Sequence, residues 1–80
     1  MATKPKKICS PINYANLARF TRKANLPATA VNDKGENVIV TTESSSLGVC
    51  YRLDTYQHNG WIRINRYYKD GSWDEEYGGR

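Results

Sequence analysis

The clearest pattern in the chain is the alternation of apolar and polar residues between residues 48 and 77. The stretch VCYRLDTYQHNGWIRINRYYKDGSW alternates on both sides of Asn59-Gly60 and again on both sides of Asp70-Gly71. A period of two is typical of strands with one buried face, and these dipeptides are strong hairpin signals. The pattern therefore predicts a three-stranded antiparallel meander over about 48–77.

The register of this meander follows if each turn contains two residues, because counting outward from both turns then pairs the strands. The count places Arg66 opposite Glu75 and one apolar set on a shared face, which we expect to form the core under a helix: Val49, Tyr51, Leu53, Ile62, Ile64, Tyr68, Trp73 and Tyr77. It sends a second set to the opposite face: Cys50, Arg52, Asp54, Tyr56, Trp61, Arg63, Asn65, Tyr67, Asp74 and Glu76.

A helical pattern precedes the meander, in SPINYANLARFTRKANLP at residues 10–27. Ser10 is a favoured N-cap, Pro11 suits the first helical position, and Pro27 prevents continuation. One side repeats at helical spacing through Tyr14, Leu17, Ala18, Thr21 and Ala24. The pattern predicts a helix over about 11–24 whose other side carries Arg19, Arg22 and Lys23 near its C-terminus, where basic side chains also complement the helix dipole.

Between these segments, ATAVNDKGENVIVTT predicts a hairpin over about 28–42, with its turn in Asn32-Asp33-Lys34-Gly35. Residues 1–9 lack a face to bury and are expected to form a basic flexible tail that includes Lys6 and Lys7. Residues 10–80 are expected to form a single α+β domain, with one N-terminal helix on an antiparallel sheet of about five strands. The helix-then-meander order is loosely similar to several small nucleic-acid binders, among them the double-stranded-RNA-binding domain. The second helix of that domain has no counterpart here, so none of its residues is carried over.

Charge is distributed unevenly along the 80 residues, whose net charge is +4. Residues 1–32 contain six basic residues and no acid, whereas residues 33–80 contain six basic and eight acidic residues. A basic front of this kind is either a solvated end or a site for an anionic partner.

Several kinds of chemistry find no support in the sequence. Two cysteines and one histidine, His58, are too few for a structural zinc site, and the phosphate-binding glycine motifs are absent. No apolar run approaches the roughly 18 residues that cross a bilayer, and no apolar stretch follows the N-terminal lysines. We expect a cytoplasmic, non-enzymatic protein without cofactor, metal or small-molecule substrate. Cys9 and Cys50 would be free thiols there, or could pair in an oxidising compartment.

Two hypotheses for function remain. In the first, the protein binds nucleic acid, with phosphates held by the N-terminal basic residues and bases stacked on the outer sheet face. The predicted site contains Lys6, Lys7, Arg19, Arg22, Lys23, Arg52, Tyr56, Trp61, Arg63 and Tyr67. In the second, the same aromatic residues beside Asp54, Asp74 and Glu76 bind a host protein, for instance as a phage- or mobile-element-encoded inhibitor of a nucleic-acid-handling complex.

Overall fold

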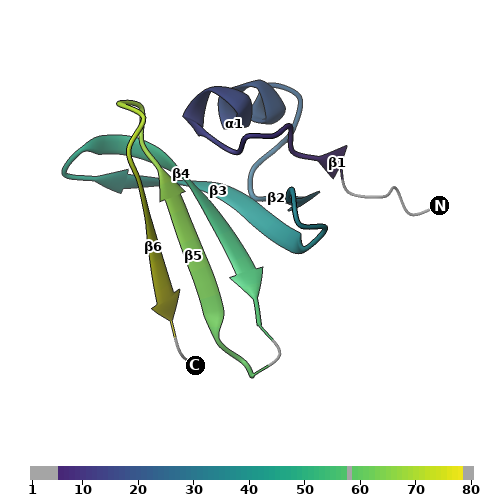
Figure 1. The fold of residues 1–80 in the computed structure, drawn as a ribbon. Helices are drawn as coiled ribbons and strands as arrows, with labels where there is room; N and C mark the ends of the chain where they lie inside the picture. The colour runs from purple at the N-terminus through teal and green to yellow at the C-terminus, as the bar shows by residue number, and fades with distance from the viewer. Residues whose placement is uncertain (1–5, 58, 79–80) are drawn as a thin grey trace.

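A computed structural model describes residues 6–57 and 59–78 of the chain. They form a six-stranded sheet in the order β1-β2-β3-β4-β5-β6, with the helix α1 (Tyr14–Thr21) over one face (Figure 1). The strands are β1 (Lys6–Lys7), β2 (Ala28–Val31), β3 (Asn37–Ser45), β4 (Gly48–Tyr56), β5 (Ile62–Tyr67) and β6 (Trp73–Gly78). Because β1 pairs with β2 in parallel and all other pairs are antiparallel, the sheet is mixed. The α+β class is confirmed, with six strands where about five were predicted.

The N-terminal segment belongs to the fold from residue 6 onward. Lys6 and Lys7 lie opposite Ala30 and Val31, and the backbone N–H of Ile8 donates to the carbonyl of Val31 at 2.8 Å. The side chain of Ile8 is fully buried in the core. The predicted tail is therefore wrong for residues 6–8, and its first five residues lie outside the described part. One apolar residue among lysines has no periodicity, so local sequence could not reveal this burial.

Helix α1 is shorter than the predicted 11–24 because its N-cap is Asn13 and not Ser10. The Oδ1 atom of Asn13 accepts a hydrogen bond from the backbone N–H of Asn16 at 2.9 Å. The side-chain amide of Asn16 donates to the carbonyl of Pro11 at 2.7 Å, which holds the preceding segment against the helix. After Thr21 the chain continues in tight turns. No helix in the described ranges is long and apolar enough to cross a membrane.

The core lies between α1 and strands β2–β4. Leu17 is the fully buried residue of the helix, and the ring of Tyr14 lies 4.9 Å from that of Tyr51, measured between centroids. The hydroxyl of Thr21 donates to the Tyr51 hydroxyl at 3.3 Å. This confirms the predicted helix face at these three positions. The buried cluster contains Ile8, Leu17, Ala30, Val38, Val40 and Leu53.

Three hairpin turns contain three residues each, where two were predicted for the meander. In each turn the first flanking residue donates its N–H to the carbonyl four positions on: Asn32 to Glu36, Gln57 to Trp61 and Tyr68 to Ser72. The third and last turn residue is a glycine with a positive φ, 84° at Gly60 and 94° at Gly71. This is a type I turn followed by a left-handed glycine, which is a common three-residue hairpin.

The extra turn residue shifts the register by one and turns β5 over. Leu53 lies opposite Asn65 and Tyr51 opposite Tyr67, where the two-residue count placed Arg66 and Tyr68. The predicted face is therefore wrong for Ile62, Ile64 and Tyr68, whose side chains lie on the side of the sheet away from α1. Ile64 and Tyr68 are nevertheless buried, as core residues should be, whereas Ile62 is half-buried. Likewise, the residues predicted for the outer face of β5 lie on the α1 side: Arg63, Asn65 and Tyr67.

The second shift cancels the first for β6, because Tyr67 lies opposite Trp73. Trp73 and Tyr77 thus lie on the α1 side of the sheet, as predicted. They are nevertheless exposed, as is Val49, because α1 packs against β4 and leaves these positions uncovered. All three were predicted to be core residues, and this part of the prediction is wrong.

Candidate functional site

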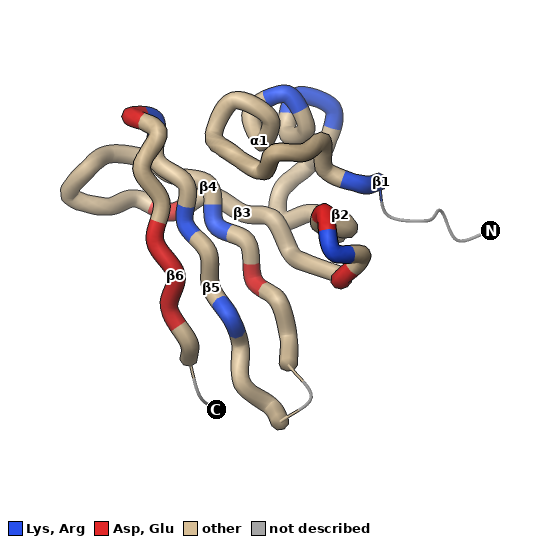
Figure 2. Tube along the Cα trace, viewed as in Figure 1, with Lys and Arg blue, Asp and Glu red and all other residues tan. Residues whose placement is uncertain are grey.

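The basic residues of β1 and of the helix region gather at one end of the molecule, which we call the basic end. It contains Lys6, Lys7, Arg19, Arg22 and Lys23, and all five side chains are exposed. Figure 2 shows basic positions around α1 and β1, and acidic positions along β6 and also at the β2–β3 turn beside β1. Within residues 6–57 and 59–78, none of the five forms an ion pair.

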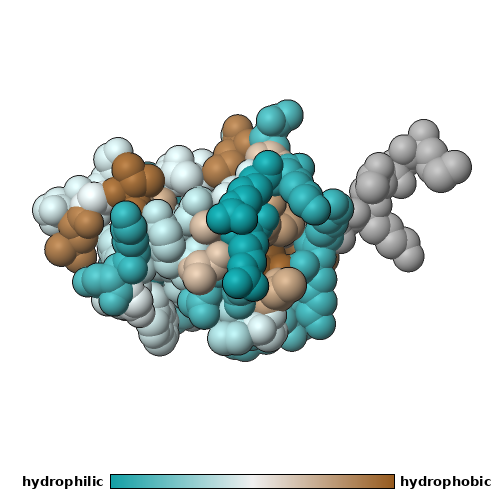
Figure 3. Space-filling view, turned by 90° about the horizontal axis from the view of Figure 1, so that it is seen from above, coloured by the Kyte–Doolittle hydropathy of each residue, from teal (hydrophilic) through white to brown (hydrophobic). Residues whose placement is uncertain are grey.

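The surface over α1 agrees with this polarity. Viewed from above, hydrophilic side chains predominate over α1 and β1 (Figure 3). Apolar atoms appear at the opposite end and also beside α1 (Figure 3). Two exposed apolar residues are Leu47, in the β3–β4 turn, and Val49, in β4. The basic end therefore forms a polar, solvent-facing surface that a charged partner can reach.

The arginines on the face away from α1 are paired within the protein. Arg52 lies opposite Arg66, and both donate to Glu43, at 2.8 Å and 2.6 Å respectively. Arg52 also pairs with Asp54 at 2.7 Å, and Arg66 with Glu76 at 2.8 Å. The predicted Arg66–Glu75 pair is therefore wrong.

These contacts neutralise the guanidinium groups of what we call the ion-pair face, the side of β3–β6 away from α1. The hydrogen bonds from the two arginines hold the pKa of Glu43 below its ordinary value. Arg52 and Tyr56, both predicted site residues, lie on this face. Arg52 therefore has no unpaired positive charge to offer a phosphate, although Tyr56 is exposed.

Two ionisable side chains are buried on the ion-pair face. The Tyr68 hydroxyl donates to Oδ2 of Asp74 at 2.8 Å, which raises the pKa of Tyr68 to about 12. Burial raises the pKa of the Cys50 thiol, so the less reactive protonated form is favoured. Cys9 is exposed, and the two cysteines are free thiols.

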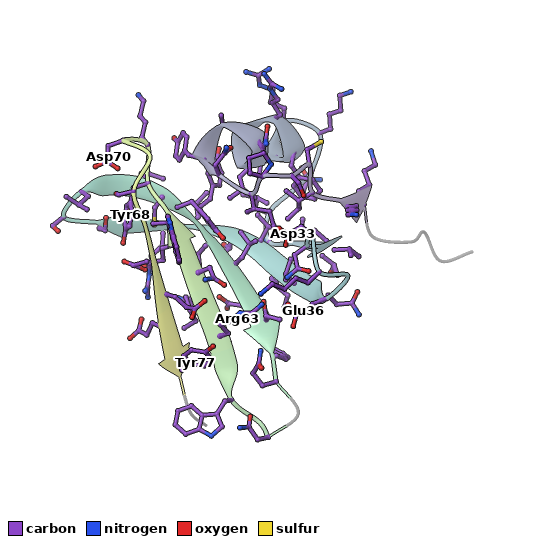
Figure 4. All side chains as sticks on the ribbon, viewed as in Figure 1. Asp33, Glu36, Arg63, Tyr68, Asp70 and Tyr77 are labelled. Atoms are coloured by element: carbon purple, nitrogen blue, oxygen red, sulfur yellow. The ribbon has the colours of Figure 1, made fainter. Side chains whose placement is uncertain are left out.

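The α1 side of β5 and β6 carries what we call the aromatic face: Trp61, Arg63, Tyr67, Trp73 and Tyr77. Tyr67 and Trp73 are stacked, with ring centroids 6.5 Å apart and planes 25° from parallel. Arg63 lies opposite Tyr77 across the strands (Figure 4). Trp61, Trp73 and Tyr77 are 46%, 62% and 55% exposed. Three predicted site residues, Trp61, Arg63 and Tyr67, thus share this face. Trp73 and Tyr77, which were predicted to be core residues, lie on the same face.

Arg63 is held at the inner border of this face. Its Nη2 atom donates to Oε1 of Glu36 at 2.7 Å and to the hydroxyl of Thr55 at 3.4 Å (Figure 4). A hydrogen bond from Asn32, and next the bond from Arg63, lower the pKa of Glu36. The buried Nε atom of Arg63 has no hydrogen-bond partner among the described residues. Arg63 is therefore a fixed positive group with a buried, unused donor at Nε.

A groove of about 330 Å³ separates the aromatic face from the rest of the domain. Its lining includes Pro11 and Ile12, the turn at residues 32–34, and Asn65. Two acids also line it: Asp33, and Glu75, which accepts a hydrogen bond from Asn65 at 3.0 Å. The groove connects the N-terminal segment with the stacked Tyr67–Trp73 pair.

The sequence signal for this face lies in the turns. Asp70-Gly71 can form a whole two-residue turn or the last two residues of a three-residue turn, and the same is true of Asn59-Gly60. Reading both as three-residue turns would have brought Trp73 and Tyr77 beside Tyr67 and Arg63.

No protein-family model, curated protein or solved structure matches this chain. Among the described residues, no group of three or more His, Cys, Asp or Glu side chains could hold a metal ion. His58 lies outside the described residues.

Proposed function

We propose that this protein is a small non-enzymatic module that binds single-stranded nucleic acid, with phosphates at the basic end and bases against the aromatic face. The observation that carries the proposal is the contrast between two sets of cations. The sheet arginines Arg52, Arg63 and Arg66 are paired with acids, whereas the five residues of the basic end form no ion pair within the described ranges. Exposed, unpaired cations release counterions from a phosphate backbone and so favour its binding.

The aromatic face supports a preference for unpaired bases. Every base has a π-face that can stack on an exposed ring, and this contact is available when the base is not within a duplex. Trp73 offers such a ring, and Tyr67 supports it from the adjacent strand. The groove volume of about 330 Å³ is at the lower end of the roughly 300–1,000 Å³ typical of ligand pockets, so it suits a single base.

The proposed site lacks two of the predicted residues and includes two that were not predicted to belong to it. Arg52 and Tyr56 are left out because they lie on the ion-pair face. Trp73 and Tyr77 replace them because they share the aromatic face with Trp61, Arg63 and Tyr67. The remaining predicted residues, those of the basic end, stay in the proposal.

Fluorescence anisotropy with a labelled oligonucleotide, single-stranded and as a duplex, tests the proposal at low salt. Replacing all five residues of the basic end by Gln should weaken binding at least tenfold and reduce its salt dependence. Replacing Lys34 and Lys69, two exposed lysines outside the basic end, by Gln is the charge control and should have a smaller effect.

The aromatic contribution is tested with Trp73→Ala, which should weaken single-strand binding about 5- to 150-fold, since stacking contributes roughly 1–3 kcal/mol per base. Tyr56→Ala is the matched control, because Tyr56 is equally exposed but lies on the ion-pair face. Absence of binding at low salt, binding that is insensitive to salt, or equal losses in the two aromatic variants would contradict the proposal.

A further inference from the structure

Strand β6 is an open edge of the sheet. It pairs with β5 on one side, and no strand of the described chain pairs with its other side. The N–H of Tyr68 donates to the carbonyl of Ser72, so the hydrogen-bonded pairs that follow this turn are 66/74 and 64/76. The backbone N–H and C=O groups of Trp73, Glu75 and Tyr77 therefore point outward, toward solvent.

This edge has charged side chains, one of the features by which proteins limit strand addition, but it lacks the others. Edge strands are commonly short or contain Lys, Pro or a bulge. The other edge of the same sheet follows that rule, since β1 has two residues and both are lysines. Strand β6 has six residues, WDEEYG, with neither Lys nor Pro. The sheet can thus accept a further strand beside β6.

The side chains of β6 select which strand can be added. Asp74 and Glu76 lie on the ion-pair face with their side chains 50% and 58% exposed, and Glu75 lies on the aromatic face. Arg66 is the cation that pairs with Asp74 and Glu76 in the described part of the chain, and it is shared with Glu43. Negative charge therefore remains along the edge.

A second copy of the protein fits this edge poorly. Two β6 strands placed antiparallel would bring acids opposite acids, which destabilises a strand pair. The basic strand of another copy, β1, spans two residues against the six of β6. A longer basic strand from a different protein satisfies both the charge and the length.

We infer that β6 binds an extended basic segment of a partner protein as a seventh strand. The main chain of the partner pairs with Trp73, Glu75 and Tyr77. Its Lys or Arg side chains on one face meet Asp74 and Glu76, and its apolar side chains on the other face pack beside Trp73 and Tyr77. Main-chain pairing supplies affinity in this mode of recognition, and alternate side chains supply specificity.

The test uses a blocked eight-residue peptide of alternating Lys and Val, titrated into the full chain at low salt by isothermal calorimetry. Glu75→Pro and Glu75→Ala are the paired variants. Both remove the same carboxylate and its bond to Asn65, but only Pro removes an outward N–H, while the pairing with β5 keeps all its hydrogen bonds. The Ala variant should bind within a few-fold of the unmodified protein, and the Pro variant at least tenfold more weakly.

Two further peptides keep the inference testable even if the Pro variant does not fold, which circular dichroism would reveal. A peptide with Glu in place of Lys should not bind, and a Lys/Val peptide with an N-methyl group at every residue should lose at least tenfold in affinity. Equal binding by the N-methylated peptide, or equal binding by the two variants, would overturn strand addition. Self-association of the free protein that Glu75→Pro abolishes, without peptide binding, would assign the edge to a second copy and overturn the inference.

Discussion

Glu43 decides the role of two arginines in the sheet. Its two carboxylate oxygens accept from Arg52 on β4 and from Arg66 on β5. Each guanidinium therefore has an acidic partner within the fold, although the sequence pattern left Arg52 free for phosphate and placed Arg66 opposite Glu75. Residue type reveals the charge of an arginine. Whether that charge is free to bind a phosphate depends on Glu43, which lies 9 positions from Arg52 and 23 from Arg66 in the chain.

The two cysteines differ in the same way, since identical thiols occupy different surroundings. Cys9 is exposed, while Cys50 is buried and its pKa is raised by that burial. We expect an aromatic disulfide reagent to label Cys9 in the folded protein and Cys50 only after denaturation, because the thiolate is the reacting form. Absorbance of the released thiolate follows the labelling, and Cys9→Ser should remove the fast phase. Fast labelling of both thiols in the folded protein would be inconsistent with the burial of Cys50.

Helix α1 shows how one element can have two plausible starting points. Ser10-Pro11 and Asn13 both suit a helix N-terminus, and the structure uses Asn13. The choice places Asn16 where its amide reaches the carbonyl of Pro11, so that the segment leading from Ile8 is held against the helix. The helix begins where the incoming chain is also anchored.

Substitution of the N-cap tests this start. Asn13→Ala should lower the free energy of unfolding by about 1 kcal/mol, because the first-turn N–H of Asn16 loses its acceptor. Ser10→Ala is the matched control and should change it by less than about 0.5 kcal/mol, as for most surface substitutions. Urea denaturation gives both values. A larger loss for Ser10→Ala than for Asn13→Ala would place the cap at Ser10.

Across residues 6–57 and 59–78, the charges divide into a basic end without ion pairs and a sheet whose arginines are paired. The ion pairs of the ion-pair face join β3, β4, β5 and β6 through Glu43 and Arg66. A carboxylate from one strand thus stabilises the positions of its neighbours, and the network resists separation of the strands.

The network makes stability depend on acidity. Glu43 has a lower pKa in the folded protein than its ordinary value of 4.5, so the folded state binds fewer protons than the unfolded state near that pH. Its contribution is complete above about pH 4.5 and is lost as the pH falls through the lowered pKa. Urea denaturation at a series of acidic pH values should show a steeper loss for the unmodified protein than for Glu43→Gln. Equal slopes would mean that Glu43 does not couple protonation to folding.

The sequence by itself determined the helix and strands β2–β6, but not β1, because the signals of the former are local. Helical spacing located α1 around Tyr14–Thr21, and alternation between turn residues located the hairpin and the meander. The charge polarity was likewise readable from residue counts. Of the candidate site, this was enough to group Trp61, Arg63 and Tyr67 on one face, since alternate residues of one strand share a face whatever the register.

Only the tertiary structure decided whether Trp61, Arg63 and Tyr67 face α1 or lie on the opposite side of the sheet, and how much of that face α1 covers. Glycine at Gly60 and Gly71 suits turns of two or three residues, and a difference of one residue reverses a strand with a period of two. This shift of one residue placed Tyr67 instead of Tyr68 opposite Tyr51. A second shift at the next turn returned the residues of β6 to their predicted face. The exposure of Trp73 depends on how far α1 extends over the sheet, and the burial of Ile8 depends on a strand 23 positions later, Val31 being its partner. These are distances in space, and a local pattern carries no information about them.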